Sequence, residues 1–358
     1  MLYILLGLLA GILLSFAPIW GPAGAIEIFP EWHGSIESVR SIEESRNPLM
    51  PKAEFPLVVR SDIFLVSANG KFLKKINFDN RLASVCSNGS YYVQYDKIGD
   101  HAELFNPSGD RFWRIKSMEY PYITSGGKLV LLMNGDHTKI RIIDIDGNPA
   151  GIKEISGTLC TVIALQQNSD YAGVGFMDGN YYILNDRGDL ITGGIVADKA
   201  IVKNIAISPN GRYSLVHYGS SKGDFLKSID ASRDKSYDLP LKHVHLTRTA
   251  LNINDNGEIA AIDYDRIIIG EEDEVESIIK IPASNPGLSS ISCSDGVYSA
   301  GYMDVDGKAH FFIFLNNGIL YQKKFSNETF IDSRIIKNIF IIRGSQGLFC
   351  YSFYKADK

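Results

Sequence analysis

The sequence predicts an all-β fold, and three observations lead to that prediction. The chain is rich in residues that favour strands and tight turns, with 33 glycines, 18 tyrosines and 18 phenylalanines beside six methionines. From Phe55 onward, short aromatic and β-branched runs alternate with Gly, Asn and Asp turns. No segment of this region keeps a hydrophobic period of 3.6 residues over three helical turns.

Composition limits the class of protein and the partners that it can bind. The chain has 358 residues, of which 45% are hydrophobic and 22% charged, so it can bury a sizeable core. Its formal net charge is −5, which leaves no strongly basic surface to neutralise a phosphate backbone. We therefore expect no nucleic-acid partner.

The first 26 residues form a separate segment. Residues 1–26 carry no charged side chain, and the run from Leu2 to Phe16 is almost purely apolar. We expect this run to form an apolar helix, although Pro18 ends it short of the roughly 20 residues that span a bilayer. The small residues Ala23, Gly24 and Ala25 suit a signal peptidase. The sequence leaves open a transmembrane anchor or a cleaved signal peptide, and either one places the rest of the chain outside the cytoplasm: facing outward on a membrane, or periplasmic or secreted.

Residues 27–55 are predicted to form a tether or linker to the main domain at residues 56–358. This stretch mixes charged residues with the chain breakers Pro30, Pro48 and Pro51. A strap packed on the main domain is the alternative, because Trp32 and Leu49 would be exposed in a free linker.

Two interleaved series of turns run through the main domain. Turns of the first series precede an aromatic or aliphatic strand, and they follow one another at an average interval of 41.5 residues. They are Asn88-Gly89, Gly126-Gly127, Ser169-Asp170, Asn210-Gly211, Asn256-Gly257, Asp295-Gly296 and Lys337-Asn338. The second series lies between them, at Asn69-Gly70, Ser108-Gly109, Asp146-Gly147, Arg187-Gly188, Arg233-Asp234, Glu271-Glu272 and Asn317-Gly318. Two hairpins in each period of about 40 residues give four strands per unit, which is the pattern of a β-propeller.

Local sequence similarity supports the same fold. Val85–Gly89 shares a Cys-Ser-Asx-Gly core with Ile291–Gly296, and Ile207–Gly211 resembles a turn common in WD40-like and lactonase-like propellers. Over roughly residues 57 to 354 the chain resembles the WD40-like and quinoprotein-like β-propeller superfamily, at the level of the fold only. Its layout is also similar to that of periplasmic propellers that assist outer-membrane protein assembly, although no cysteine precedes Cys86 as a lipid attachment point.

The ends of the repeat region predict how the ring closes. The first outer hairpin lacks an inner hairpin before it, and the last inner hairpin lacks a complete outer hairpin after it. We therefore expect seven four-stranded blades, with residues 57–76 and 331–343 sharing one sheet, which leaves no free sheet edge. Eight blades are the alternative, because the strand at Leu348–Phe353 is left over.

No residue pattern in the chain predicts a catalytic, cofactor-binding or metal site. The four cysteines are expected to be buried free thiols, with Cys293 and Cys350 as the pair best able to form a disulfide. His243 and His245 could supply half of a metal site, but no third ligand lies near them in the sequence.

Three further segments have the letters of a functional motif but are interpreted as turns. Asp144–Asn148, Asn254–Gly257 and Asp304–Gly307 look like calcium loops, yet the glutamate that would complete such a loop is missing. Gly219–Gly223 fits the G-x-S-x-G pattern, but a strand rather than a helix follows it. The acidic run Glu271–Glu276 is interpreted as a solvated hairpin.

These observations favour a non-catalytic propeller scaffold, tethered to a membrane or secreted, that binds a protein or peptide partner at the cell envelope. Two alternatives stay open. One is a propeller enzyme, lactonase-like or sugar-cleaving, with its site in the central channel, and the other is a small-ligand sensor domain. No cofactor is predicted.

Overall fold

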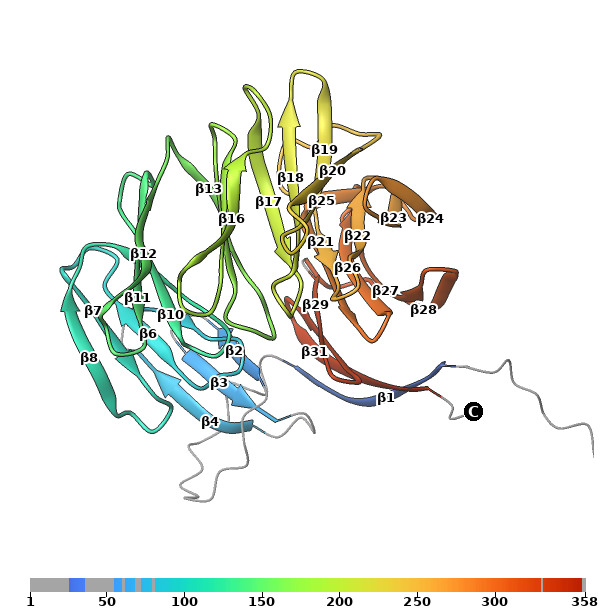
Figure 1. Ribbon diagram of the computed structural model, residues 1–358. Coiled ribbons are helices and arrows are strands. Elements are labelled where there is room, and N and C mark those ends of the chain that lie inside the picture. The colour runs from blue at the N-terminus through green and yellow to red at the C-terminus, as the bar shows by residue number, and fades with distance from the viewer. Residues whose placement is uncertain are drawn as a thin grey trace, which may run out of the picture.

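Eight small β-sheets arranged as a ring make up the computed structural model (Figure 1). The structure describes residues 26–35, 55–59, 62–67, 72–78, 81–329 and 331–355. Within these ranges every regular element is a β-strand. Neighbouring strands of each sheet are antiparallel. Seven of the sheets consist of consecutive strands, whereas the eighth combines the first described strand with the last three.

We number the sheets as blades in chain order. Blade 1 contains β2 (Phe55–Val59), β3 (Asp62–Val66) and β4 (Phe72–Asn77), and blade 2 contains β5 (Leu82–Val85), β6 (Tyr92–Tyr95), β7 (His101–Phe105) and β8 (Arg111–Lys116). Blade 3 contains β9 (Tyr120–Ile123), β10 (Leu129–Met133), β11 (Lys139–Asp144) and β12 (Pro149–Ser156). Blade 4 contains β13 (Cys160–Leu165), β14 (Ala172–Phe176), β15 (Asn180–Leu184) and β16 (Leu190–Ile195). Blade 5 contains β17 (Ile201–Ile207), β18 (Tyr213–Ser220), β19 (Gly223–Asp230) and β20 (Lys235–Pro240).

The remaining strands form three blades. Blade 6 contains β21 (Leu251–Ile253), β22 (Glu258–Asp263), β23 (Arg266–Glu271) and β24 (Glu274–Lys280). Blade 7 contains β25 (Ser284–Ser294), β26 (Val297–Asp304), β27 (Ala309–Leu315) and β28 (Gly318–Phe325). Blade 8 joins β29 (Ile331–Ile336), β30 (Ile339–Gly344) and β31 (Gly347–Lys355) to β1 (Ile26–Ser35) from the other end of the described chain.

The repeated Asx-Gly pairs form the hairpin turns, because their glycines adopt a left-handed backbone. Gly89, Gly211 and Gly257 have φ angles of 71°, 73° and 91° at the turn between the first and second strands of their blades. In blade 7 the turn has only two residues, Asp295 and Gly296, and both have positive φ, as a type I′ hairpin requires. The repeated pairs therefore located these hairpin turns correctly.

The predicted number of blades is wrong, because the ring has eight blades rather than seven. Residues 57–76 and 331–343 were expected to share one sheet, but the former lie in blade 1 and the latter in blade 8. The leftover strand at Leu348–Phe353 is β31, the third strand of blade 8, and β1 pairs with it in antiparallel register, with Ile28 opposite Phe353 and His33 opposite Phe349. The first ten described residues thus complete the last blade.

Blade 8 packs directly against blade 1, which closes the ring. Phe55, Leu57 and Phe64 of blade 1 form a buried cluster with Ile341 and Leu348 of blade 8. The guanidinium of Arg343 also donates a 3.0 Å hydrogen bond to the carbonyl oxygen of Val58. Apolar burial and this hydrogen bond both hold the first and last blades together.

The predicted apolar helix at residues 1–26 has no counterpart in the described part of the chain. Residues 1–25 lie outside the described residues, and Ile26 begins β1. Among the described residues the structure has no helix, and therefore none that is long and apolar enough to cross a bilayer. For residues 27–55 the sequence left open a tether or a strap, and residues 27–35 lie in β1.

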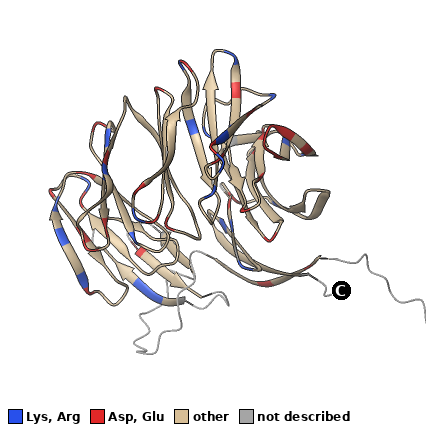
Figure 2. Cartoon of the chain, in the orientation of Figure 1, with Lys and Arg blue, Asp and Glu red and all other residues tan. Residues whose placement is uncertain are grey.

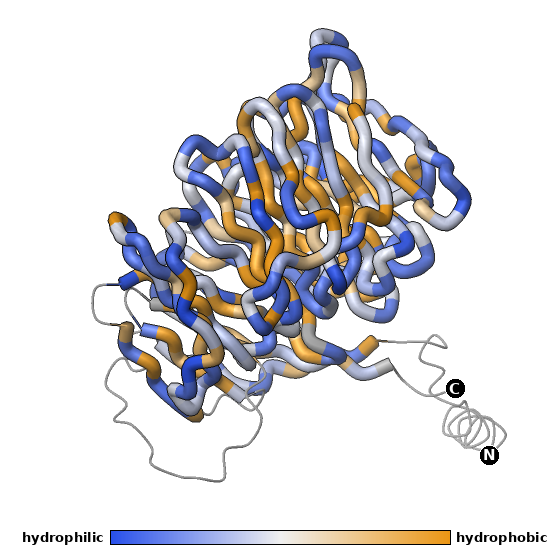
Figure 3. The backbone as a smooth tube through the Cα atoms, turned by 60° about the vertical axis from the view of Figure 1, so that its left-hand side comes forward, coloured by the Kyte–Doolittle hydropathy of each residue, from blue (hydrophilic) through white to orange (hydrophobic). Residues whose placement is uncertain are grey.

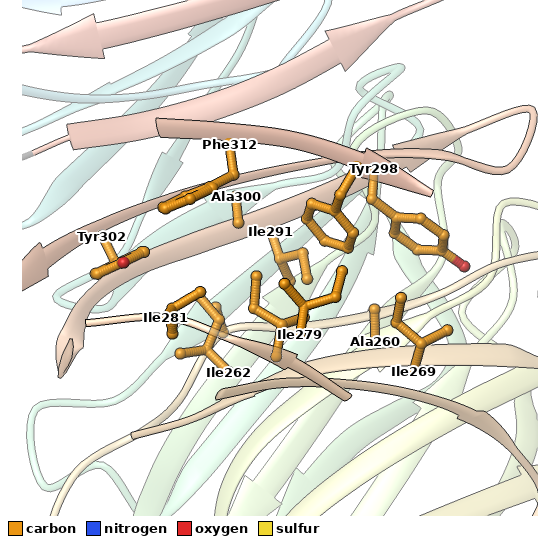
Figure 4. Packing of buried hydrophobic residues seen from close by; sticks show 13 residues of the cluster. Ala260, Ile262, Ile269, Ile279, Ile281, Ile291, Tyr298, Ala300, Tyr302 and Phe312 are labelled. Atoms are coloured by element: carbon orange, nitrogen blue, oxygen red, sulfur yellow. The ribbon is translucent and has the colours of Figure 1, made fainter. Parts of the chain in front are cut away.

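The hydrophobic core consists of layers between neighbouring blades. Figure 3 shows that the most hydrophobic stretches run through the middle of the blades, whereas the turns are mostly hydrophilic. The largest buried cluster joins Ile262 and Ile269 of blade 6 to Tyr298, Tyr302 and Phe312 of blade 7 (Figure 4). Such layers bury both sides of a blade, so the inner and middle strands are apolar on both faces.

Candidate functional site

Because the strands within each blade are antiparallel, the ring has two different faces. The turns between the first and second strands and between the third and fourth strands lie at one face, which we call the turn face. The turns between the second and third strands, and the connections from one blade to the next, lie at the opposite face, which we call the loop face. The turns Asn88-Gly89, Asn210-Gly211, Asn256-Gly257 and Asp295-Gly296 therefore belong to the turn face, whereas the turn at Asp304–Gly307 belongs to the loop face.

A cavity of about 650 Å³ lies along the inner strands of blades 4 to 7 and reaches Ile335 of blade 8. Its wall combines carboxamide side chains with apolar and small ones. The carboxamides include Gln166, Asn204, Asn252, Asn254 and Asn256, and the apolar residues include Val162, Ala164, Ala206, Ile253 and Ile291. The amide oxygen of Asn252 is buried and has no hydrogen-bond partner among the described residues. An N–H donor from a ligand would satisfy it.

A second cavity, of about 730 Å³, opens at the turn face between blades 2, 3, 4, 7 and 8. Hydroxyl groups hold three of its turns together. The Oγ atoms of Ser87 and Ser125 both donate to the carbonyl oxygen of Gln167, at 2.6 and 2.5 Å, and so connect blades 2, 3 and 4. These three turns form one side of the wall of this second cavity.

The carboxylates that line the cavities are used to hold turns in place. Oδ1 of Asp170 accepts hydrogen bonds from Thr124 Oγ1 and from the backbone N–H of Gly126, both at 2.7 Å. Oδ1 of Asp255 accepts one from the backbone N–H of Asn210 at 2.8 Å. Each bond crosses from one blade to the next, so these acids fix the spacing of neighbouring blades at the turn face.

Two arginines carry positive charge in the cavity walls. Arg248 lines the cavity of about 650 Å³ from the connection between blades 5 and 6, and Arg334 lines the second cavity from β29. Neither guanidinium has an ion-pair partner within 4.0 Å in the part of the chain that the structure describes. Both are available to a carboxylate or a carbonyl group of a ligand.

A network of buried charges lies at the loop face between blades 5 and 6. Asp224, at the start of β19, accepts hydrogen bonds from Lys203 Nζ at 2.8 Å and from His217 Nε2 at 2.9 Å. It also accepts one from the backbone N–H of His245 at 3.0 Å. Although burial alone raises its pKa, these hydrogen bonds lower the pKa of Asp224 to about 2.

A second buried carboxylate, Asp263, extends this network. It lies 3.0 Å from Nε2 of His245 and 2.6 Å from a guanidinium nitrogen of Arg266, and it also accepts hydrogen bonds from the backbone N–H groups of Lys242 and His243. Burial raises the pKa of Asp263, but the hydrogen bonds from His245 and Arg266 outweigh it and hold the pKa well below its usual range. The two carboxylates thus fix the connection between blades 5 and 6.

His243 and His245 lie in this connection rather than on a strand, and both rings contact Asp263 instead of forming a metal site. No group of three metal-ligating side chains occurs among residues that the structure describes. Asp224, Asp263 and His217, which these histidines contact, were not predicted from the sequence. The one available signal was a polar residue inside an apolar strand, such as His217 in β18.

None of the four cysteines forms a disulfide, so the pairing of Cys293 with Cys350 is not formed. Burial raises the pKa of Cys86 to about 11 and that of Cys293 to about 12. Both are therefore protonated at neutral pH and are poor nucleophiles.

The motif-like segments form turns in the structure. The carboxylate of Asp144 accepts hydrogen bonds from the backbone N–H groups of Asp146 and Asn148, within its own turn. The G-x-S-x-G segment is a hairpin in which Ser221 and Lys222 connect β18 to β19. The acidic run Glu271–Glu276 lies at the exposed hairpin between β23 and β24.

Comparison with known proteins supports the fold. A family model described as a beta-propeller protein matches residues 2–265. The crystal structure of BamB from Moraxella catarrhalis is similar with a TM-score of 0.55 and 12% identity, covering 93% of this chain and 99% of that one. A chain in the crystal structure of a mitotic checkpoint complex is similar with a TM-score of 0.52 and 12% identity, covering 87% and 95%.

A third similar structure is that of an enzyme. Virginiamycin B lyase from Staphylococcus aureus is similar with a TM-score of 0.50 and 11% identity, covering 77% of this chain and 96% of that one. No curated protein matches the sequence. At these identities the structural likeness concerns the fold alone.

Proposed function

Because the chain belongs to this beta-propeller protein family, we propose that it is a non-catalytic scaffold that holds a protein or peptide partner at the cell envelope. The observation that carries the proposal is the cavity of about 650 Å³, whose wall offers carboxamide groups among apolar side chains. A carboxamide both donates and accepts hydrogen bonds, as does each peptide group of a bound chain.

The chemistry of the cavities suits binding better than acid–base catalysis. A propeller enzyme of the lactonase-like or sugar-cleaving kind needs carboxylates or histidines that are free to exchange protons near the axis. Here Asp170 and Asp255 accept hydrogen bonds from neighbouring turns, and Asp295 is likewise engaged. The partnerless oxygen of Asn252 and the guanidinium of Arg334 are instead suited to recognise the N–H and C=O groups of a polypeptide.

The uncharged apolar segment at residues 1–26 supports a location outside the cytoplasm, as an anchor or as a cleaved signal. In this proposal β1, at residues 26–35, is already part of the ring as the outer strand of blade 8, and residues 56–358 carry the binding site. One of the similar chains comes from the structure of a mitotic checkpoint complex, which is a protein assembly. Because that likeness concerns the fold alone, the partner of this chain has to be identified by experiment.

Binding to a random peptide library tests the proposal. A phage-displayed library is panned against the purified full chain, and the affinity of the enriched peptides is measured by fluorescence anisotropy. Ala206→Trp fills the cavity wall, and we expect it to weaken binding at least about tenfold. Asn252→Ala removes one acceptor without adding volume, and we expect a loss of about fivefold.

The matched control is Glu276→Trp, which adds the same side chain on the exposed outer strand β24 and should leave the affinity unchanged. Thermal unfolding of each variant establishes that it is folded. If no peptide is enriched, or if the enriched peptides bind Ala206→Trp as tightly as the unaltered chain, the polypeptide-binding proposal is wrong.

A small-ligand sensor is the second candidate, and the size of the same cavity favours it. A volume of about 650 Å³ lies within the range of roughly 300 to 1,000 Å³ that is common for small-molecule sites. A metabolite panel in a thermal-shift assay tests this candidate. A ligand that raises the melting temperature of the unaltered chain, but not that of Ala206→Trp, supports it, and an unresponsive panel contradicts it.

A further inference from the structure

The loop face carries two exposed apolar side chains on either side of a buried histidine. Val244 is 67% exposed and Leu246 is 97% exposed, whereas His245 between them is 3% exposed. All three lie in the connection between β20 and β21. A single exposed leucine is common on protein surfaces, but paired apolar tips on one short connection need an explanation.

This connection is held rigidly by the buried network between blades 5 and 6. The backbone N–H of His245 donates to Asp224, and its ring contacts Asp263. Its carbonyl oxygen accepts a 2.5 Å hydrogen bond from Lys203 Nζ. The positions of Val244 and Leu246 are therefore fixed before any partner arrives, which reduces the entropy lost on binding.

Neighbouring loops of blades 6 and 7 extend the apolar surface. The ring of Tyr264 packs 5.2 Å from that of His243, and the carbonyl oxygen of Tyr264 accepts a 2.8 Å hydrogen bond from the backbone N–H of Ser284. Leu288, which is 44% exposed, lies at the irregularity of β25 between Asn285 and Ser289, close to the start of that strand. The carbonyl oxygen of Ala283, just before β25, accepts a hydrogen bond from the backbone N–H of Val305, which is 60% exposed. We call these five residues the loop patch: Val244, Leu246, Tyr264, Leu288 and Val305.

We infer that the loop patch docks a folded protein whose contact surface presents apolar side chains within a rim of both charge signs. The charges beside the patch alternate in sign, because Lys242 lies 3.9 Å from Asp265, and Lys308 lies 4.0 Å from Asp306. Figure 2 shows acidic and basic residues interspersed over the same blades. An anionic membrane surface would instead select a clearly basic patch.

The ends of the described chain point away from the patch. Ile26 pairs with Lys355, whereas Ser35 pairs with Gly347 beside the turn between β30 and β31. Because that turn belongs to the loop face, Ile26 and Lys355 lie at the turn face. Ile26, where the described chain begins, therefore lies on the side opposite the loop patch. The inference therefore goes beyond the proposed function, which uses the cavity of about 650 Å³ along the inner strands and the turn face.

Site-specific photocrosslinking in cells that naturally make this protein tests the inference. Benzoylphenylalanine replaces Leu246 in one full-length variant and Leu320, an exposed residue of the outer strand β28, in the control. We expect position 246 to yield one predominant protein adduct that position 320 does not yield. The adduct is identified by mass spectrometry, and the identified protein is purified separately and mixed with the full chain.

The mixture should give a one-to-one complex on size-exclusion chromatography. We expect the double variant Val244→Ser, Leu246→Ser to weaken the complex at least about tenfold, and the control Ile319→Ser, Leu320→Ser to leave it unchanged. An adduct with lipid, with a second copy of this chain or within the same chain contradicts the inference, as does an undiminished affinity. Ala206→Trp should leave this complex intact, so its survival separates the loop patch from the channel proposal.

Discussion

Nε2 of His217 lies 2.9 Å from Oδ2 of Asp224, and both side chains are shut off from solvent between blades 5 and 6. The other ring nitrogen, Nδ1, is buried and has no hydrogen-bond partner among the described residues. If the ring were protonated, its Nδ1–H would be buried without a hydrogen-bond acceptor among the described residues. Burial accordingly lowers the pKa of His217 from its ordinary value of 6.5, in spite of the neighbouring carboxylate.

This lowered pKa predicts that stability declines as the pH falls below about 6.5. Between that pH and the pKa of the folded state, the unfolded chain binds a proton that the folded chain does not bind, so the free energy of unfolding decreases. A single such group gives a slope of up to about 1.4 kcal/mol per pH unit. Melting temperatures measured from about pH 8 to about pH 5 should therefore fall.

The variant His217→Gln tests the assignment, because glutamine can still donate to Asp224 but does not titrate. We expect its melting temperature to fall less steeply below about pH 6.5 than that of the unaltered chain. Equal slopes in the two proteins would exclude His217 as the source. The carboxylates add a separate decline at lower pH, since the pKa of Asp224 is lowered to about 2 and its stabilisation is lost as the pH falls from about 3.8 towards that value.

Neutralising the buried carboxylate of Asp224 should lower the free energy of unfolding far more than neutralising a surface acid. Asp224→Asn leaves Lys203 and His217 without their anionic partner in a buried site, and we expect the free energy of unfolding to fall by about 3 to 5 kcal/mol. Glu154→Gln removes an exposed ion pair with Lys139 and should change it by less than about 1 kcal/mol. Urea unfolding measures both, and similar losses would argue against the buried network.

This network could not be predicted from the sequence, because most of its contacts join residues that are about 20 positions apart in the chain. Strand positions and turns depend on neighbouring residues, so the Asx-Gly pairs at Asn88-Gly89 and Asn210-Gly211 located their hairpins correctly. The network joins paired strands β17, β18 and β19 of blade 5 to His245, in the connection between β20 and β21, and through it to Asp263 of blade 6. Strand pairing and blade packing bring these residues together, and neither can be read from neighbouring residues in the sequence. Likewise, the pairing of Ile28 with Phe353 joins opposite ends of the described chain, and the blade number depended on it.

A close approach between blades 3 and 4 predicts that substitution by alanine destabilises the protein much more at Gly151 than at Gly109. Gly151 has a φ of 52°, and an added Cβ would lie 1.9 Å from the carbonyl group of Gly188. Backbone at that distance cannot rotate away, so Gly151→Ala should displace the turn and lower the free energy of unfolding by more than about 2 kcal/mol. Gly109 has a φ of 95° but nothing within 4 Å of an added Cβ, so Gly109→Ala should cost only about 1 kcal/mol. Equal losses in urea unfolding would contradict the close approach.

The cysteines should be unreactive in the folded protein. Burial raises the pKa of Cys86 and of Cys160 to about 11, so almost no thiolate is present at about pH 8. Titration with Ellman's reagent should find almost no fast-reacting thiol in the native chain and all four after denaturation, because none is in a disulfide. A count of two after denaturation would instead reveal a disulfide. Fast labelling of the native chain would contradict the burial.

The outer strand of blade 8 should be needed to keep the ring closed. β1 covers the edge of β31 along ten residues, Ile28 packs on the buried cluster around Phe353, and Glu31 accepts a hydrogen bond from Ser352. Removing residues 2–35 uncovers this edge, and an uncovered edge pairs with other chains. We expect the melting temperature to fall by at least about 5 °C and light scattering to increase with concentration, whereas removal of residues 2–25, which keeps β1, is the control. A synthetic peptide of residues 26–35 should restore the melting temperature of the shorter variant, and a scrambled peptide should not. If both truncated proteins melt at the same temperature and stay monomeric, β1 does not stabilise blade 8.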